Sequence, residues 1–335
     1  MFTHLHLHSE FSLLDGLARI PDILDRVQAD GQTACALTDH GVLYGAIDFY
    51  REAKARGINP IIGVEAYVAP GSRLDRDPQG KNPYHLTLLA KDRAGYGNLL
   101  KLVSSANLEG YYYRPRIDRE LLEHHHQGII ALSGCPSGEL HRALQDGRDE
   151  DARAIAGWYR DLFGEDYFIE VQSHGNLDEF ERVTPKLVEL ARRMGLPLVA
   201  TNDSHYTDRA DHALHDVLLC IGTNATVDEE KRMRMSDDSY YVKTEAEMRA
   251  LFAELPEAID NTARIAERCA IDLDFDRLHL PVPDIPEASP PTSTWRSWRG
   301  RGCGAAILTR TKRCAAAWST SWMWCARPGS EPTSW

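Results

Sequence analysis

HLHLHSEFSLLDG (residues 4–16) begins with three histidines that alternate with leucines. Because side chains of an extended strand alternate between its two faces, His4, His6 and His8 would share one face. Imidazoles clustered in this way suit a divalent metal such as zinc or manganese. Solvated histidines, or histidines satisfied inside a core, give the same pattern, so this stretch alone leaves both interpretations open.

Strand-like and helix-like segments alternate over the part of the chain that follows. Apolar runs predict strands, and amphipathic runs bounded by Pro or Gly predict helices. Such alternation predicts an α/β fold on a parallel sheet, either open or closed into a barrel. The predicted strands span residues 33–38, 59–68, 85–90, 128–133, 166–171 and 196–201, and the predicted helices span 20–31, 44–57, 92–108, 117–126, 148–163 and 179–195.

Ionisable side chains lie inside or directly after these predicted strands. The carboxyl ends of parallel strands meet at one end of the sheet, where α/β proteins place their active sites. We therefore expect convergence of Asp15 in SLLDG, Asp39 and His40 in TDHG, Glu65 in GVEAY, His85 in PYHL, Cys135 in SGCPSG, and Asp203 and His205 in TNDSH. This set exceeds the needs of one tetrahedral ion, and sites with several metals typically hydrolyse phosphoesters.

These motifs resemble, in order and spacing, those of the PHP (polymerase and histidinol phosphatase) domain family. The matching segments are HLHLHSEFSLLDG, LTDHG, GVEAYVA, NPYHLTLLA, LSGCPSGEL and ATNDSHY. Two further segments, GYGNLLKLVSSANLEGYYYRPRID and DSYYVKTEAEMRALFAELPEAIDNT, are similar to the N-terminal PHP domains of bacterial DNA polymerase III alpha subunits. The resemblance covers about residues 1–287. It implies a distorted seven-stranded β/α barrel with a metal site at the C-terminal ends of the strands.

The resemblance also implies three divalent metal ions, which would be zinc, manganese or magnesium. Carried over by position, it assigns His6, His8, Glu65 and Asp203 to the first metal, Glu65, His85 and Cys135 to the second, and Asp15, His40 and His205 to the third. A metal-bound hydroxide held by Glu65, Asp203 and His85 would be the nucleophile. His4 matches no ligand position, so we expect it to have a structural or supporting role.

Two functions follow from the resemblance. The first is a metal-dependent phosphoesterase, a 3′–5′ exonuclease that removes nucleotides from a DNA 3′ end during replication, alongside other replicase subunits. The second is a catalytically silent scaffold, stabilised by its metals, that docks polymerase or proofreading subunits. The polymerase carboxylates of the family belong to a palm domain beyond residue 335, so we do not expect this chain to polymerise DNA. The alpha-type segments argue against a stand-alone histidinol-phosphatase-like enzyme.

Composition limits the cellular locations and the binding partners that the chain could have. No run approaches the roughly 18 consecutive apolar residues of a membrane span, and the N-terminus lacks the features of a signal peptide. The seven cysteines are scattered, as expected in a reducing compartment, so we predict a cytoplasmic protein with no membrane partner. The formal net charge of −12 argues against strong unaided binding to a DNA duplex.

Predictions also follow from an aromatic run, a histidine run and three cysteines. The run Tyr111–Tyr113 beside Arg114 and Arg116 could stack on single-stranded bases or pack against a neighbouring polymerase domain, so DNA contacts remain unassigned. His124–His126 should mark an exposed helix end. Cysteines inside apolar or helical patterns should be packing residues, and these are Cys35, Cys220 and Cys269.

The sequence changes character near Pro290. We expect a PHP domain with an alpha-type helical extension over 1–277, a Pro-rich linker over 278–290 and a disordered tail over 291–335. The tail holds six of the seven tryptophans, seven Lys/Arg and a single acid. We interpret it as a frameshifted translation, because shifting the frame one base earlier turns each Trp into Leu, Met or Val and permits alpha-like segments. A genuine basic tail that binds nucleic acid is the alternative, and stop codons in the earlier frame of the gene would exclude the frameshift.

Overall fold

The structure is a computed structural model that describes residues 1–276, except residues 14, 79–81 and 176–177. The predicted linker (278–290) and tail (291–335) lie outside the described residues, so the boundaries and nature of both remain predictions. Met1–Leu273 forms one unit by its internal packing. Among the described residues, none of the helices has both the length and the apolar character that crossing a membrane requires.

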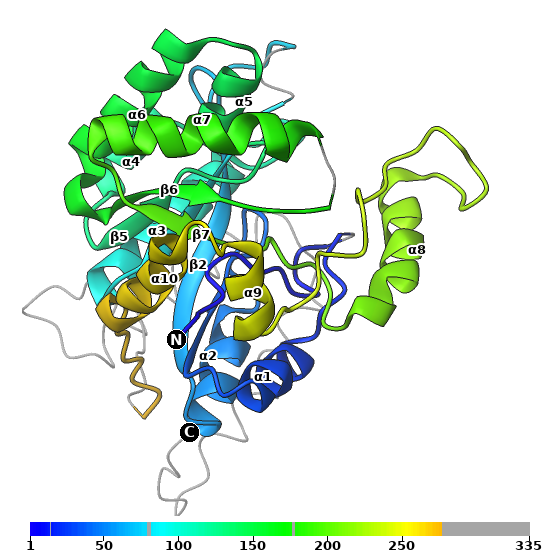
Figure 1. The fold of residues 1–335 in the computed structure, drawn as a ribbon. Helices are drawn as coiled ribbons and strands as arrows, with labels where there is room; N and C mark the ends of the chain where they lie inside the picture. Colours follow the sequence, from blue (N-terminus) through cyan, green and yellow to red (C-terminus); the bar gives the residue numbers. More distant parts are fainter. Residues whose placement is uncertain (14, 79–81, 176–177, 277–335) are drawn as a thin grey trace, which may run out of the picture. The chain divides into compact units, whose positions relative to one another are not determined.

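A seven-stranded sheet is the frame of this unit (Figure 1). Its strands are β1 (Ala34–Leu37), β2 (Asn59–Val68), β3 (Tyr84–Ala90), β4 (Arg116–Ile117), β5 (Ile129–Leu132), β6 (Tyr167–Val171) and β7 (Leu198–Ala200). Their spatial order is β1-β2-β3-β5-β6-β7, and β4 pairs with β2. All of the predicted strands are present, and the short β4 is an addition.

The sheet is mixed, so the prediction of a parallel sheet was wrong for one strand. β3 runs antiparallel to both β2 and β5, whereas the β1–β2, β5–β6 and β6–β7 pairs are parallel. A parallel neighbour requires a crossover connection, usually through a helix. No helix is described between β2 and β3, and the chain turns back to lie beside the strand it has just left.

The N-terminal segment 4–8 closes the curled sheet into the distorted barrel. On one side its carbonyls accept from β1 and its continuation, Ala36 N–H to the His4 carbonyl at 2.8 Å and Thr38 N–H to the Leu7 carbonyl at 2.9 Å. On the other side the His8 N–H donates to the Ser204 carbonyl beyond β7 at 2.8 Å. Leu5 and Leu7 are fully buried in apolar clusters, as the alternation of the sequence predicts.

All six predicted helices are present. They are α1 (Ile20–Ala29), α2 (Ala46–Ala55), α3 (Arg93–Leu108), α4 (Arg119–His125), α6 (Asp149–Phe163) and α7 (Asp178–Met194). Asp92 and Asp118 cap α3 and α4 by accepting from main-chain N–H groups three residues later, which explains where these helices begin. The structure adds α5 (Glu139–Gln145), α8 (His212–Thr223), α9 (Glu245–Leu251), α10 (Pro256–Arg268) and two single-turn 3-10 helices, Gly164–Asp166 and Arg209–Asp211.

The structure accounts for a glycine of β2, for three cysteines and for the histidines at the end of α4. Gly63 of β2 has no room for a side chain, since a Cβ there would lie 2.7 Å from the Leu88 carbonyl of β3. Cys35, Cys220 and Cys269 are all buried, in agreement with the prediction that they serve packing. At the end of α4, the Nδ1 atoms of His124 and His126 lie within 3.0 Å of main-chain carbonyls of the same helix.

Candidate metal centre

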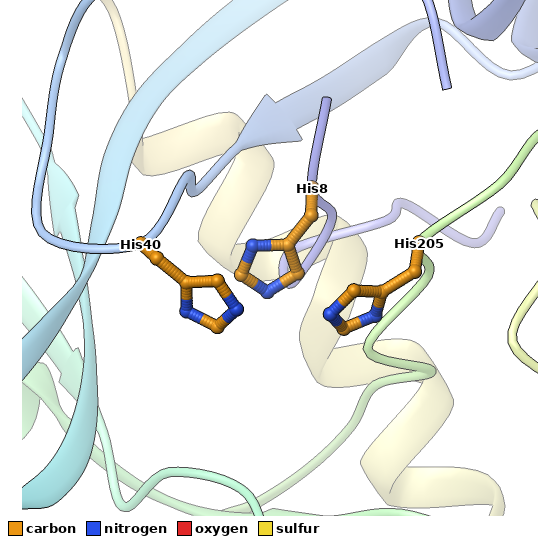
Figure 2. A group of neighbouring side chains, drawn as sticks. All are labelled: His8, His40 and His205. Atoms are coloured by element: carbon orange, nitrogen blue, oxygen red, sulfur yellow. The ribbon is translucent and has the colours of Figure 1, made fainter. Parts of the chain in front are cut away.

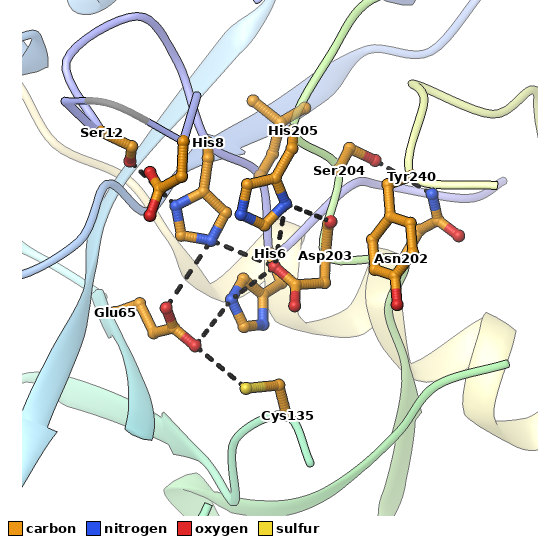
Figure 3. A network of polar contacts seen from close by, with 12 residues as sticks. His6, His8, Ser12, Glu65, Cys135, Asn202, Asp203, Ser204, His205 and Tyr240 are labelled. Atoms are coloured by element: carbon orange, nitrogen blue, oxygen red, sulfur yellow. Dashed lines mark hydrogen bonds and ion pairs between the residues drawn. The ribbon is translucent and has the colours of Figure 1, made fainter. Parts of the chain in front are cut away.

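Nine side chains meet at one end of the barrel. Figure 3 shows six of them, which are His6, His8, Glu65, Cys135, Asp203 and His205. Segment 4–8 supplies His6 and His8, the loop after it supplies Asp15, and the chain beyond β1 supplies His40. Glu65 lies on β2, Cys135 follows β5, and Asp203 and His205 follow β7. His85 is the second residue of β3, and it reaches the same end because β3 is antiparallel to its neighbours. The reversal of β3 therefore preserves the convergence that the sequence predicts.

Glu65 is the hub of this group. Its carboxylate is buried, and one oxygen, Oε1, lies 2.7 Å from His85 Nδ1, 3.3 Å from Cys135 Sγ and 3.3 Å from His6 Nε2. The other oxygen, Oε2, lies 2.5 Å from His40 Nδ1. A carboxylate whose two oxygens face different ligand sets has the geometry of a group that bridges metals.

Asp203 is the second acidic contact. Its Oδ1 lies 3.1 Å from His8 Nε2, 3.4 Å from His6 Nε2 and 3.6 Å from His205 Nδ1. The residue has a φ of 49°, a left-handed conformation that costs a non-glycine residue on the order of 1 kcal/mol or more. The surrounding structure holds the carboxylate against these histidines despite that cost.

Three imidazoles of the group lie side by side (Figure 2). The ring of His8 lies between those of His40 and His205, with centroid distances of 4.1 and 4.4 Å. His40 Nε2 also lies 3.2 Å from Asp15 Oδ2, which connects the ninth residue to the rest. All nine predicted residues thus form one connected cluster.

Three sets of ligand atoms lie close enough to share an ion. In each of them the ligand atoms are within 4.8 Å of one another, and the sets are His8–His40–His205, His6–His8–Asp203 and His40–Glu65–His85. The first and third sets combine residues that the family resemblance assigns to different metals. The division of the nine residues among individual metals therefore remains a prediction.

The orientation of the histidines fits metal ligation. The His6 Nδ1–H donates to Glu170, the His8 Nδ1–H to Ser12 Oγ and the His205 Nδ1–H to the Asp203 carbonyl, at 2.7, 2.9 and 2.8 Å. In each ring this leaves the Nε2 lone pair for a metal. Within the described residues, several buried atoms of the cluster form no well-directed hydrogen bond although they face one another at short distance, including His6 Nε2, His8 Nε2, Glu65 Oε2 and Asp203 Oδ1. Buried polar atoms without partners are costly, and divalent cations would satisfy them.

The electrostatics of the cluster are those of a cation site. Burial alone would lower the pKa of His6, but Asp203, Glu170 and Glu65 outweigh burial and raise that pKa well above 6.5. Burial would raise the pKa of Glu65, but His85, His40 and His6 hold it well below 4.5. The buried carboxylates therefore stay ionised and attract positive charge, whether it comes from protons or from metals.

Glu170 is a supporting residue that sequence reasoning missed. It lies on β6, is 1% exposed, and accepts from His6 Nδ1 at 2.7 Å. Its carboxylate also accepts from the Gly134 N–H and from side chains of neighbouring strands, which are Thr87, Thr201 and Gln172. The available signal was an acid inside the otherwise apolar strand DYFIEV, since a buried carboxylate in such a strand needs partners.

One sequence expectation at this end of the barrel needs correction, that for Asp39, and the expected structural role of His4 agrees with its contacts. Asp39 does not face the cluster but accepts from the Ser9 N–H at 2.7 Å and from Ser12 Oγ at 2.8 Å, so it shapes the loop that positions His8. Burial raises the pKa of Asp39. His4 does not join His6 and His8, because its Nε2 lies 2.8 Å from the Lys243 carbonyl. Its role is structural.

Comparisons with known proteins show the family of this chain. The model of the PHP domain family matches residues 4–174. The DNA polymerase III subunit alpha of Borreliella burgdorferi is 47% identical over 288 residues, which is 85% of this chain and 25% of that protein. The subunit of the same name from Thermus aquaticus is 47% identical over 295 residues, 85% of this chain and 24% of that protein. The chain thus spans about a quarter of the length of these relatives.

More distant similarity extends to solved structures. A putative metal-dependent phosphoesterase from Bifidobacterium adolescentis aligns with 74% of this chain and 95% of its own, at 14% identity and a TM-score of 0.41. Histidinol phosphate phosphatase from Lactococcus lactis, solved with zinc, L-histidinol and phosphate, aligns with 65% of this chain and 92% of its own, at 15% identity and a TM-score of 0.32.

Proposed function

This chain belongs to the PHP domain family, and we propose that its nine-residue cluster is a multinuclear metal centre that hydrolyses phosphodiesters at a DNA 3′ end. The observation that carries the proposal is the position of Glu65, whose two carboxylate oxygens contact different sets of candidate ligands. Similarity to DNA polymerase III alpha subunits supports DNA as the substrate and replication as the setting, with other replicase subunits as partners and the cytoplasm as the location.

His6, His8, Asp15, His40, Glu65, His85, Cys135, Asp203 and His205 would hold the metals. Bound divalent ions would withdraw charge from the phosphoryl oxygens and lower the pKa of water near the phosphorus. Glu170 and Ser12 would fix the His6 and His8 rings with Nε2 directed into the site. The carboxylates of Glu65 and Asp203 would give the site negative charge and so retain the bound cations.

The reaction would be addition of water across the terminal P–O3′ bond. The water oxygen forms the new bond to phosphorus as the P–O3′ bond breaks. One proton of the water goes to the departing 3′ oxygen. The products are a strand shortened by one nucleotide and a nucleoside 5′-monophosphate. This is 3′–5′ exonuclease chemistry, and it needs no reactant other than water.

A 3′-labelled single strand tests the proposal. Purified protein should release the label in the presence of manganese or zinc, and His8→Ala should reduce the rate at least 100-fold. His124→Ala, which removes an exposed histidine outside the cluster, is the matched control and should retain the wild-type rate. Absence of label release, with wild type and His8→Ala indistinguishable, would instead favour the scaffold that docks polymerase or proofreading subunits.

A further inference from the structure

A tyrosine-rich loop reaches the same end of the barrel as the metal centre. This loop, Gly110–Arg116, connects α3 to β4 and is called here the tyrosine loop. β4 pairs in parallel with the end of β2, with Arg116 opposite Tyr67. Because Tyr67 is two residues beyond Glu65 on the same strand, this pairing brings the loop to the strand that carries the hub carboxylate.

Tyr67 connects the loop to the metal centre. Its ring centroid lies 5.9 Å from that of His40 and 5.1 Å from that of His85. The guanidinium carbon of Arg114 lies 5.7 Å from the same ring centroid. Arg114 is therefore separated from two predicted ligands by a single aromatic ring.

A second contact fixes this position. Gly41, the residue after His40, has a φ of 61°, and a Cβ there would lie 2.8 Å from Pro115 Cγ. Since Pro115 follows Arg114 directly, the backbone beside one predicted ligand packs against the side-chain ring of the residue beside the arginine. The position of Arg114 at the edge of the site is thus set by packing at two points.

The two arginines of the loop have different roles, which the sequence could not distinguish. Arg116 is fully buried, and its guanidinium donates to three main-chain carbonyls, those of Gly110, Arg73 and Asp75, at 3.0, 2.8 and 2.7 Å. These bonds hold both ends of the loop in place. Arg116 is consequently a structural residue and is not available to a ligand.

Arg114 is exposed and available. No carboxylate lies within ion-pair distance of it in the part of the chain that the structure describes. The contrast is Arg73 nearby, whose guanidinium contacts Glu109, Asp118 and Glu120. In an acidic protein, an arginine without a paired carboxylate at the edge of an acidic site is a specific feature, because a free cation there attracts anions such as phosphate.

Two exposed aromatic rings precede this arginine in the sequence. Tyr111 and Tyr113 are 58% and 61% exposed, which is unusual for large rings. Tyr113 also has a φ of 61°, and a bulky residue in the left-handed region costs about 1–3 kcal/mol. Its ring packs edge to face on that of Tyr112, at a centroid distance of 4.8 Å, and most of its surface stays exposed.

We propose that Arg114 and the exposed rings of Tyr111 and Tyr113 form a binding site for single-stranded DNA that leads into the metal centre. The guanidinium binds a backbone phosphate, and a tyrosine ring stacks on a base, which is the combination that single-strand sites use without sequence preference. This assignment rests on the proposed function, since it places the strand beside the cluster that would cleave it. It also explains how a protein with net charge −12 would hold an anionic strand.

The test separates binding from hydrolysis. Fluorescence anisotropy would measure the Kd of manganese-loaded protein for a labelled oligothymidylate whose 3′ linkages are hydrolysis-resistant phosphorothioates. Arg114→Gln should weaken binding about tenfold and lower the slope of log Kd against log salt by about 0.7, the value for one phosphate contact on a single strand. Tyr113→Ala should weaken binding about tenfold with an unchanged salt slope. Arg153→Gln, at an exposed arginine of α6, is the matched control and should bind as wild type does.

A small phosphodiester separates failure of this inference from failure of the proposed function. Hydrolysis of bis(p-nitrophenyl) phosphate should change less than about twofold in Arg114→Gln, because that substrate is too short to use the loop. If wild type cleaves no diester while Arg114→Gln still loses strand binding, the proposed function fails and the binding site stands. If Arg114→Gln and Tyr113→Ala bind the strand with wild-type affinity and salt slope, the inference is overturned and the loop is a packing surface for another domain.

Discussion

His6 and Glu170 are joined by a hydrogen bond of 2.7 Å between Nδ1 and Oε1, and both side chains are completely shielded from solvent. The bond places the proton of the ring on Nδ1 and leaves Nε2 facing Glu65 and Asp203. Carboxylates that hold ligating histidines in this way also increase their basicity. Glu170, on the apolar strand β6, thus fixes the orientation of the His6 ring within the cluster.

Glu170→Gln should lower metal affinity about 10–100-fold, because the amide cannot accept from the ring and from its other donors at once. Competition with a chromophoric chelator would measure the affinity, with circular dichroism used to verify that the variant is folded. Glu257→Gln, on the exposed face of α10, is the control. A folded Glu170→Gln protein with wild-type affinity would show that Glu170 does not support the centre.

Removal of metals should destabilise the fold. The cluster joins segment 4–8 to β2, β3 and the chain after β5 and β7, so ions held there bind the native state and not the unfolded one. We expect chelation to lower Tm by at least about 5 °C, at roughly 2–4 °C per kcal/mol for a chain of this size. Differential scanning calorimetry would measure it, and the loss should be smaller in His8→Ala. Superimposable curves with and without chelator would contradict a structural contribution from metals.

Cys135→Ser should change which metal the site prefers. A thiolate favours zinc over manganese, whereas a hydroxyl is a poor ligand for either. Burial, followed by Glu65 and Asp203, raises the pKa of the Cys135 thiol, so in the absence of metal the thiol stays protonated. We expect zinc affinity to fall at least tenfold and manganese affinity to fall less, measured by titration calorimetry. Cys220→Ser, at a buried thiol of α8, should alter neither, and equal losses for both metals in Cys135→Ser would exclude a zinc-selective thiolate.

His141 should make stability depend on pH. Burial lowers the pKa of this α5 histidine to about 4, and its ring packs near Phe180. Because the folded pKa lies below the unfolded value of 6.5, the unfolded chain takes up the proton first as pH falls. Stability from this residue is present above pH 6.5 and is lost between about pH 6.5 and 4, a change of about 3 kcal/mol.

Urea unfolding of metal-free protein across this pH range would measure the effect. The difference in unfolding free energy between wild type and His141→Leu should shift by about 3 kcal/mol in favour of the variant as pH falls from 6.5 to 4. His124→Leu, at an exposed position, should follow wild type throughout. A constant difference between wild type and His141→Leu would exclude the effect.

The sequence alone predicted that the nine candidate ligands converge, but it did not predict the residues that support them. His6, His8 and Glu65 belong to motifs whose spacing relative to apolar runs places them at strand ends, so their meeting follows from the α/β alternation. The direction of β3 could not be read, because a seven-residue apolar strand has the same pattern in either direction. His85 still reaches the cluster because it begins the reversed strand and does not end it.

Supporting contacts were missed because they join residues far apart in the chain. Glu170 meets His6 across 164 positions, and no local pattern records such a contact. Alternation along segment 4–8 correctly predicted that Leu5 and Leu7 are buried, and it placed His4 on the face of His6 and His8. The partner of His4, the Lys243 carbonyl 239 positions away, could not be read from the sequence, although its expected structural role agrees with this contact.

Metal content of the purified protein tests the central claim most directly. After equilibrium dialysis against zinc or manganese, mass spectrometry of the metal should give about three ions per wild-type chain. Glu65→Gln should retain at most one, because Glu65 contacts His6, His40, His85 and Cys135 together. A wild-type content of one ion or fewer, unchanged in Glu65→Gln, would contradict a multinuclear centre built around this carboxylate.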